Sequence, residues 1–158
     1  RARDIHSLNE QFIDLVLSGC ESMNSIVDID RGLLDSLQHL SPDERKRAAQ
    51  TNRLLFEISP DGTNIADDER VLQLIERVNL VMRDFAKDDR GLAVTYLGAT
   101  KARCEELLAM GVSDVREACG TQCSLKVIPL GLGGFKMLGH LANPDERTIY
   151  VTLAANDD

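Results

Sequence analysis

Apolar residues recur at three- and four-residue spacing along most of this chain, and that period is typical of amphipathic helices. In the first segment, Ile5, Leu8, Phe12 and Val16 follow this spacing and fall on one helical face. The same pattern predicts six helices, over residues 4–17, 30–39, 42–51, 68–87, 100–110 and 112–119. We therefore expect a mostly α fold.

One helix start is especially well marked. Ser41 can cap the helix, Pro42 suits its first position, and Glu44 completes a capping box. Short apolar runs predict strands over residues 54–58 and 125–128, and the β-branched and aromatic run 148–153 predicts a C-terminal strand. The remaining segments are expected to be an apolar connector (92–97), a flexible glycine-rich connector (131–134), a helical turn or strand (135–141) and a turn (143–146).

Many positions match each other at an offset of 70 residues, which indicates an internal repeat. The matches are Leu37 with Leu107, Ala48 with Ala118, Thr51 with Thr121, Leu55 with Leu125, Ile58 with Ile128 and, in the preceding helices, Asn9 with Asn79. We interpret the chain as two tandem helix–helix–helix–strand units. Residues 1–63 form the first unit, 64–130 the second, and 131–158 a glycine-rich connector and strand. The polar segment 64–68 is the expected linker.

The overall charge changes the expectation about partners. The net charge is −8 and the isoelectric point about 4.9, so nucleic acid would repel the chain as a whole. No apolar run is long enough to span a membrane, and the first residues carry no apolar signal core. Four cysteines without a secretory signal favour reduced thiols, so we expect a cytoplasmic protein.

One dense basic cluster is present, formed by Arg45, Lys46 and Arg47 with Arg53 downstream. Such a cluster can contact phosphates. A solvated helix face, with Asp43 paired to Arg47 one turn on, is the alternative that we favour. The matching positions of the second unit are Val115, Arg116 and Glu117, so the basic character is not repeated.

A second candidate for phosphate binding is the corner Met110-Gly111-Val112, between two short predicted helices. It resembles the hairpin of helix-hairpin-helix proteins, whose amides hold phosphates. That family usually has a second glycine and nearby basic residues, and here Ser113 takes the place of that glycine. A plain corner at which Gly111 ends a helix is the alternative.

The sequence favours no catalytic or metal-binding role. Cys119 and Cys123 would need further ligands for zinc, and buried small side chains explain them better. The three histidines, His6, His39 and His140, stand in no catalytic motif. We therefore expect a protein that is not an enzyme and has no metal or cofactor.

The first unit resembles the flagellar transcription regulator FlhD family over residues 5 to 60. The resemblance rests on Ile5-His6-Ser7-Leu8-Asn9, Val27-Asp28-Ile29, Leu37-x-x-Leu40-Ser41-Pro42 and the run from Ala48 to Phe56. The second unit resembles the family chiefly through its match to the first. Family members usually have one unit, often with a Cys in the strand segment, where this chain has Phe56. No disulfide-linked dimer can therefore be carried over.

This resemblance implies a mostly helical transcription regulator that acts with an FlhC-like partner, in which the structural zinc and much of the DNA contact belong to the partner. Two fused units imply an intrachain pseudo-dimer, or a higher oligomer. The strand around Leu55 would then pair with the strand around Leu125 across a pseudo-two-fold axis. The expected pairing surface consists of Leu54, Leu55, Phe56, Leu125 and Val127. Direct DNA binding through the helix corners, or a role as an adaptor or secretion-linked chaperone, are the alternatives.

Overall fold

The computed structural model describes residues 2–18, 31–59, 69–118, 124–130 and 133–156. Helices occupy each of the six segments in which the hydrophobic period predicts them, and the fold is mostly helical with two short strands, as expected. These helices are α1 (Ala2–Leu17), α3 (Arg31–His39), α4 (Pro42–Ala49), α5 (Glu69–Asp88), α7 (Lys101–Ala109) and α8 (Val112–Ala118). The predicted linker 64–68 lies outside the described residues.

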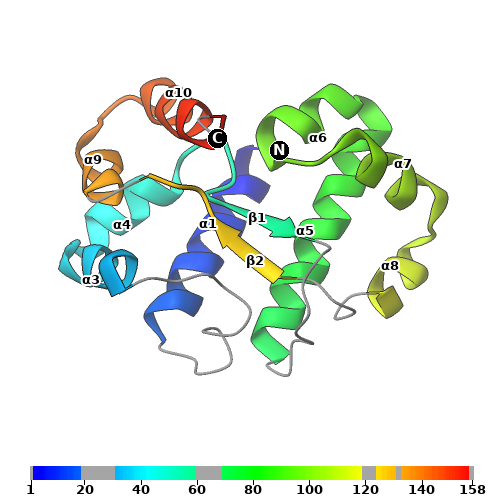
Figure 1. Ribbon diagram of the computed structural model, residues 1–158, viewed down its shortest axis with the longest axis horizontal. Coiled ribbons are helices and arrows are strands. Elements are labelled where there is room, and N and C mark those ends of the chain that lie inside the picture. Colours follow the sequence, from blue (N-terminus) through cyan, green and yellow to red (C-terminus); the bar gives the residue numbers. More distant parts are fainter. Residues whose placement is uncertain (1, 19–30, 60–68, 119–123, 131–132, 157–158) are drawn as a thin grey trace.

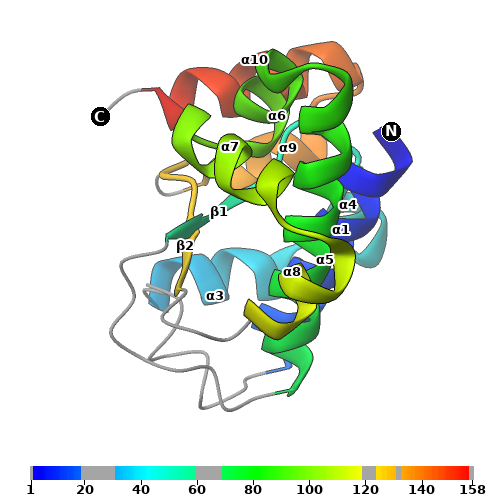
Figure 2. The same cartoon turned by 90° about the vertical axis from the view of Figure 1, so that its right-hand side faces the viewer.

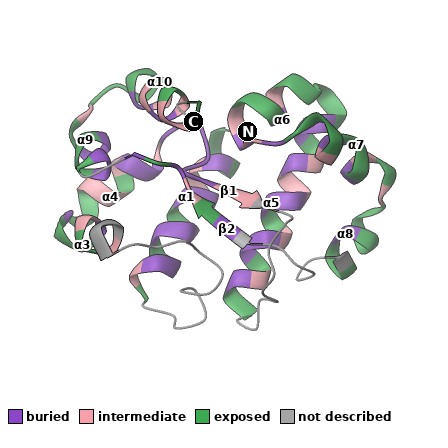
Figure 3. Ribbon diagram, viewed as in Figure 1, coloured by how far each residue is buried: buried purple, intermediate pink, exposed green. Residues whose placement is uncertain are grey.

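Two long helices, α1 and α5, pack against each other in the middle of the molecule (Figure 1). Each turns one apolar stripe inward, so that Leu8 and Phe12 of α1 and Leu74 and Val78 of α5 are fully buried. The core continues without interruption into both flanks, as the burial colouring in Figure 3 shows. Burying a side chain of this size stabilises a fold by about 1.5–3 kcal/mol, so the two long helices supply much of the stabilising burial.

A two-stranded antiparallel sheet crosses these helices. It consists of β1 (Phe56–Ser59) and β2 (Ser124–Val127), with Phe56 opposite Val127 and Ile58 opposite Leu125. The ladder extends one step further, because the Ile128 amide donates to the Leu55 carbonyl at 3.0 Å. The expected pairing of the two strands is therefore confirmed, and it joins residues 65 to 71 positions apart in the chain.

On each flank, two short helices pack on one of the long helices. Helices α3 and α4 contact α1, and helices α7 and α8 contact α5 (Figures 1 and 2). Two starts depart from the offset of 70: α5 begins at Glu69, three residues before position 72 (2 + 70), and β2 begins at Ser124, two residues before position 126 (56 + 70). Duplication of an ancestral unit and a pseudo-two-fold axis remain predictions, as do the three expected domain boundaries.

The predicted start of α4 is confirmed in detail. The Ser41 hydroxyl accepts a hydrogen bond from the Glu44 amide at 3.1 Å, and the Glu44 carboxylate accepts one from the Ser41 amide at 3.1 Å. Pro42 occupies the first turn, where a missing N–H has no cost. These three residues thus fix where α4 begins.

The predicted C-terminal strand is wrong, because residues 148–153 lie inside the helix α10 (Pro144–Ala155). The segment 143–146, expected as a turn, is the start of this helix, with Asn143 capping it by accepting from the Asp145 amide. The hydroxyl groups of Thr148 and Thr152 each donate to the carbonyl four residues back, so both residues are accommodated in a helix. Capping and packing outweigh β-propensity here.

The apolar connector expected over residues 92–97 is also wrong, because this segment belongs to the helix α6 (Arg90–Leu97). Asp89 caps it by accepting from the Gly91 amide at 2.8 Å. Gly98 ends it in the left-handed region, with φ at 68°, which favours glycine. Of the glycine-rich connector, Gly133 and Gly134 are described, and Gly134 begins the helix α9 (Gly134–His140).

The C-terminal pair of helices returns to the first half of the chain. Helix α9 packs on α4, and its Gly139 lies so close that an added Cβ would stand 3.1 Å from Glu44. The Thr148 hydroxyl of α10 accepts from the Asn52 amide at 3.0 Å. Among the described residues, no helix has the length and apolar character needed to cross a membrane.

Candidate functional site

The expected phosphate-binding cluster does not form one basic surface. The Arg45 guanidinium donates to the Leu40 carbonyl at 3.1 Å, and that of Arg47 donates to the Gly139 carbonyl at 2.5 Å. Both side chains are half-buried by these contacts, whereas Lys46 is exposed. The two arginine side chains therefore connect α4 to the residue before its cap, Leu40, and to α9.

Arg53 lies still further from a ligand-binding position. Its side chain is only 4% exposed, and it forms an ion pair with Glu57 at 3.1 Å. It also donates to the Leu54 carbonyl at 3.0 Å. Gly98 leaves the room for this pair, since a Cβ there would stand 3.0 Å from atoms of both Arg53 and Glu57. A phosphate reaching Arg53 would have to displace Glu57.

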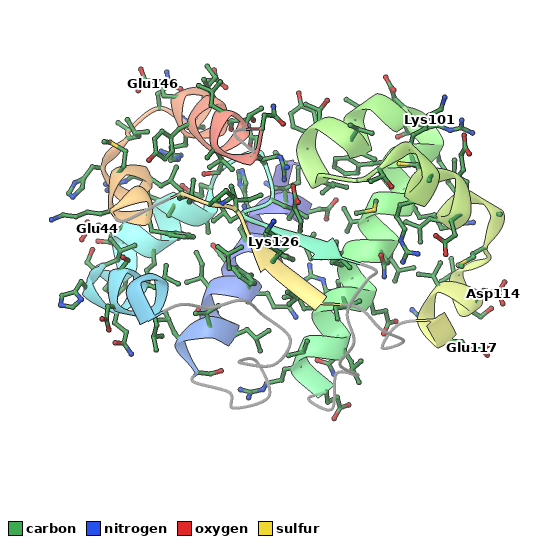
Figure 4. The ribbon with its side chains drawn as sticks, viewed as in Figure 1. Glu44, Lys101, Asp114, Glu117, Lys126 and Glu146 are labelled. Atoms are coloured by element: carbon green, nitrogen blue, oxygen red, sulfur yellow. The ribbon has the colours of Figure 1, made fainter. Side chains whose placement is uncertain are left out.

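The corner at Gly111 is equally unsuited to phosphate. Its amide, the group that a phosphate would need, donates to the Asp114 carboxylate at 3.2 Å. The Met110 carbonyl accepts from Arg83 at 2.9 Å. Asp114 and Glu117 stand on the outer side of α8 in Figure 4, and Arg116 is paired with Glu76 at 3.0 Å. The corner lies between the end of α7 and the start of α8, and its exposed side is acidic.

The residues expected to form the pairing surface meet in the core. Leu54, Leu55, Phe56 and Leu125 are each 0–1% exposed, and Val127 is half-buried. Phe56 stacks on Phe12 with ring centroids 4.4 Å apart, which anchors β1 on α1. The Leu54 amide donates to the Tyr96 carbonyl of α6 at 2.9 Å instead of bonding to β2. The pairing is thus intramolecular.

A buried asparagine that sequence reasoning did not single out holds the segment before β1. The Asn9 amide group donates to the carbonyls of Ala49, Thr51 and Arg53 at 3.1–3.3 Å, and its oxygen accepts from the Leu55 amide at 3.0 Å. Asn9 is 0% exposed. Its counterpart in the repeat, Asn79, is also buried and accepts from Arg103 at 3.2 Å. The signals in the sequence were the position of Asn9 on the apolar face of α1 and its match to Asn79 at the offset of 70 residues.

Arg147 is a second buried polar residue whose contacts the sequence did not reveal. Although 2% exposed, its guanidinium donates to the Leu141 carbonyl at 2.5 Å and the Gln50 carbonyl at 3.3 Å, while its Nε has no partner among the described residues. Burial lowers the pKa of this guanidinium below its ordinary value. Arg147 therefore joins α10 to the end of α4. The guanidinium of Arg147, the only cation of α10, points away from the surface.

A shallow hollow of about 670 Å³ lies where α3, α4 and α9 meet. Glu44 and His140 contact each other at its side, with 3.4 Å between the carboxylate and Nε2. The hydrogen bonds from the Ser41 amide and hydroxyl hold the pKa of Glu44 below its ordinary value, with smaller contributions from His140 and Arg47. The hollow is lined by the acidic residues Asp35 and Glu44 and by His39, Lys136 and His140. It therefore presents groups of both signs, and not one sign of charge, to a ligand.

The thiol and imidazole groups of the described residues occupy structural positions. Cys104 is fully buried, and burial raises the pKa of its thiol, which disfavours the reactive thiolate. His6 contacts the Asn52 side chain at 2.7 Å, and His39 the Asp35 carbonyl at 2.6 Å. No group of three potential metal ligands occurs in the part of the chain that the structure describes, and Cys119 and Cys123 lie outside it.

Comparison with protein-family models, curated proteins and solved structures yields no match to this chain.

Proposed function

We propose that this chain is a non-enzymatic transcription regulator that acts by binding another regulatory protein, in the manner implied by its resemblance to FlhD. On this proposal the FlhC-like partner is basic and contains the zinc site, and the complex contacts DNA mainly through that partner. A cytoplasmic location and a pseudo-dimer of two FlhD-like units belong to the same proposal.

The observation that carries the proposal is the internal use of the basic cluster. Arg45 and Arg47 are bonded to backbone carbonyls, and Arg53 is buried against Glu57. Direct DNA binding would require several such side chains to be free to reach phosphates. The acidic corner at Gly111 and the net charge of −8 argue in the same direction. A role through contact with a protein partner, in contrast, does not need free basic side chains on α4 or at the Gly111 corner.

The first experiment measures DNA binding by the isolated chain, using fluorescence anisotropy with promoter fragments from the native host. We expect only salt-sensitive, sequence-independent binding, with a dissociation constant of roughly 10⁻⁴ M or weaker at physiological salt. On our proposal, Lys46→Ala changes this dissociation constant little. Tight binding to one promoter by the chain alone would overturn the proposal in favour of direct DNA recognition.

A tagged chain is then used to capture partners from the native host, with mass spectrometry as the readout. A basic, zinc-containing protein that confers tight promoter binding on the mixture is the expected result. Capture of an exported protein in its place would support the chaperone alternative and contradict a role in transcription.

A further inference from the structure

Helix α10 exposes an apolar pair that the fold leaves uncovered. Ile149 is 60% exposed and Leu153 is 66% exposed, and these are the two highest exposures among the large apolar side chains of the described residues. The two lie four residues apart, so they are neighbours on one face of the helix. The opposite face carries Arg147 and Val151, which are buried against the rest of the molecule.

The exposed charges that α10 itself places next to this pair are of one sign. Asp145 and Glu146, both exposed, precede Ile149 by four and three residues, so they share its face. Glu146 stands on the outer side of α10 in Figure 4. The single cation of the helix, Arg147, is buried and donates inward to carbonyls. The α10 face, defined as Asp145, Glu146, Ile149 and Leu153, is thus apolar at one end and acidic at the other.

This combination selects the partner. An exposed apolar pair binds apolar side chains of another chain, and the adjacent carboxylates favour Lys or Arg on that chain. A second copy of the protein is disfavoured, because each copy brings the same acidic residues and a net charge of −8. We infer that the α10 face is the docking surface for a basic amphipathic segment of the partner protein, an inference that rests on the proposed regulatory function.

A peptide assay tests the chemistry of this surface directly. The probe is a fluorescein-labelled 18-residue helical peptide of Leu and Lys, with the leucines on one face, and its counterpart carries Glu in place of Lys. We expect the full chain to bind the Leu–Lys peptide saturably and at least tenfold more tightly than the Leu–Glu peptide. Absence of saturable binding up to on the order of 100 μM peptide would overturn the inference.

Variants then locate the binding. Ile149→Ser with Leu153→Ser is expected to weaken Leu–Lys binding at least tenfold. Asp145→Asn with Glu146→Gln is expected to weaken it severalfold and to reduce its dependence on salt. Helix α8 offers matched controls, because Val112 is 47% exposed and Glu117 is exposed, so Val112→Ser and Glu117→Gln should bind within twofold of wild type. Circular dichroism checks that each variant is folded. Equal binding by the α10 and α8 variants would overturn the inference.

Partner capture separates this inference from the proposed function. If wild type and the Ile149/Leu153 variant capture the same native regulatory partner equally well, the function stands and the docking surface is wrong. If the peptide binds through α10 but no regulatory partner is captured by wild type, the surface stands and the function is wrong. Sedimentation that shows a wild-type dimer, lost in the Ile149/Leu153 variant, would assign the face to a second copy and overturn the inference.

Discussion

At the scale of single residues, buried polar side chains organise the segment that leads into β1. Asn9 makes four hydrogen bonds to backbone groups of residues 49–55, all of them more than 35 positions away in the chain. A buried backbone amide or carbonyl that loses its partner is costly, so one asparagine amide holds an irregular segment in place.

Replacing Asn9 with Ala should therefore be strongly destabilising. It leaves the Leu55 amide and three carbonyls without this partner, and we expect a loss of about 2–4 kcal/mol in the free energy of unfolding. Urea denaturation followed by circular dichroism measures it. The neighbouring Glu10→Ala, at an exposed position of the same helix, should change the stability by less than about 0.5 kcal/mol. Equal effects of the two substitutions would contradict this role for Asn9.

The sequence could not have shown what Asn9 and Arg147 do. An asparagine on an apolar helix face and an arginine early in a polar run have many possible partners, and the observed ones lie 40–46 residues away for Asn9 and 97 residues away for the Arg147 contact with Gln50. Local pattern contains no information on contacts at that range. The same limit applies to Arg53, which looked like a free cation and is buried beside Glu57.

At the scale of elements, two nearly identical start signals lead to different predictions. The helix start predicted at Ser41-Pro42-Asp43-Glu44 is confirmed, whereas the turn predicted at Asn143-Pro144-Asp145-Glu146 is wrong. Both begin helices, α4 and α10, with a polar cap and a proline in the first turn. The β-branched residues that follow the second signal favour a strand, but the hydroxyls of Thr148 and Thr152 bond to carbonyls within the helix.

The long helices could be predicted, because they follow from apolar periodicity, and the pairing of the strands was expected from the resemblance to FlhD together with the repeat. Helix α6 could not, because its apolar residues show no clear helical stripe, and its boundaries depend on Asp89 and Gly98. The return of α9 onto α4 had no signal in the sequence, because Arg47 bonds there to a backbone carbonyl, that of Gly139, and the close approach is made at a glycine.

The start of α4 leads to a prediction about acid stability. Hydrogen bonds from Ser41 hold the pKa of Glu44 below its ordinary value of 4.5, so the ionised form is favoured in the folded state. Glu44 therefore contributes stability above pH 4.5, and this contribution is lost as the pH falls through its lower, folded-state pKa. We expect wild type to melt at a higher temperature than Glu44→Gln near neutral pH, and the two curves to converge as the pH falls through the lowered folded-state pKa of Glu44.

Thermal unfolding of both proteins as a function of pH measures this difference. Gln can still accept from the Ser41 amide, so the substitution removes the charge and retains the capping geometry. In a Ser41→Ala background the pH-dependent part should shrink, because the hydroxyl is one of the two main contributors. A difference between wild type and Glu44→Gln that does not change with pH would contradict this explanation.

At the scale of the whole molecule, the two halves share one core and one sheet. Buried residues from α1, α5 and both strands belong to a continuous cluster. A chain built in this way should unfold in a single transition. The two tyrosines of the protein allow a test, because Tyr96 lies in α6 and Tyr150 in α10, on opposite flanks.

We predict the same urea midpoint for the two flanks. Tyr150→Phe leaves Tyr96 as the only fluorescent reporter, and Tyr96→Phe leaves Tyr150, while the absence of Trp keeps the background low. The unfolding of each variant is also followed by circular dichroism, which corrects for any stability change caused by the substitution itself. Separate transitions for the two reporters would show two independently folding units.

The return of α9 and α10 to α4 has a consequence for how the protein is made. Arg47 contacts Gly139, 92 positions later in the chain, and Gln50 contacts Arg147, 97 positions later. A ribosome adds roughly 5–20 residues each second, so α4 waits about 5–20 s after its own synthesis for these contacts. Until α9 and α10 emerge from the ribosome, the surface of α4 that they cover in the folded protein stays exposed. During that time chaperones can bind this surface.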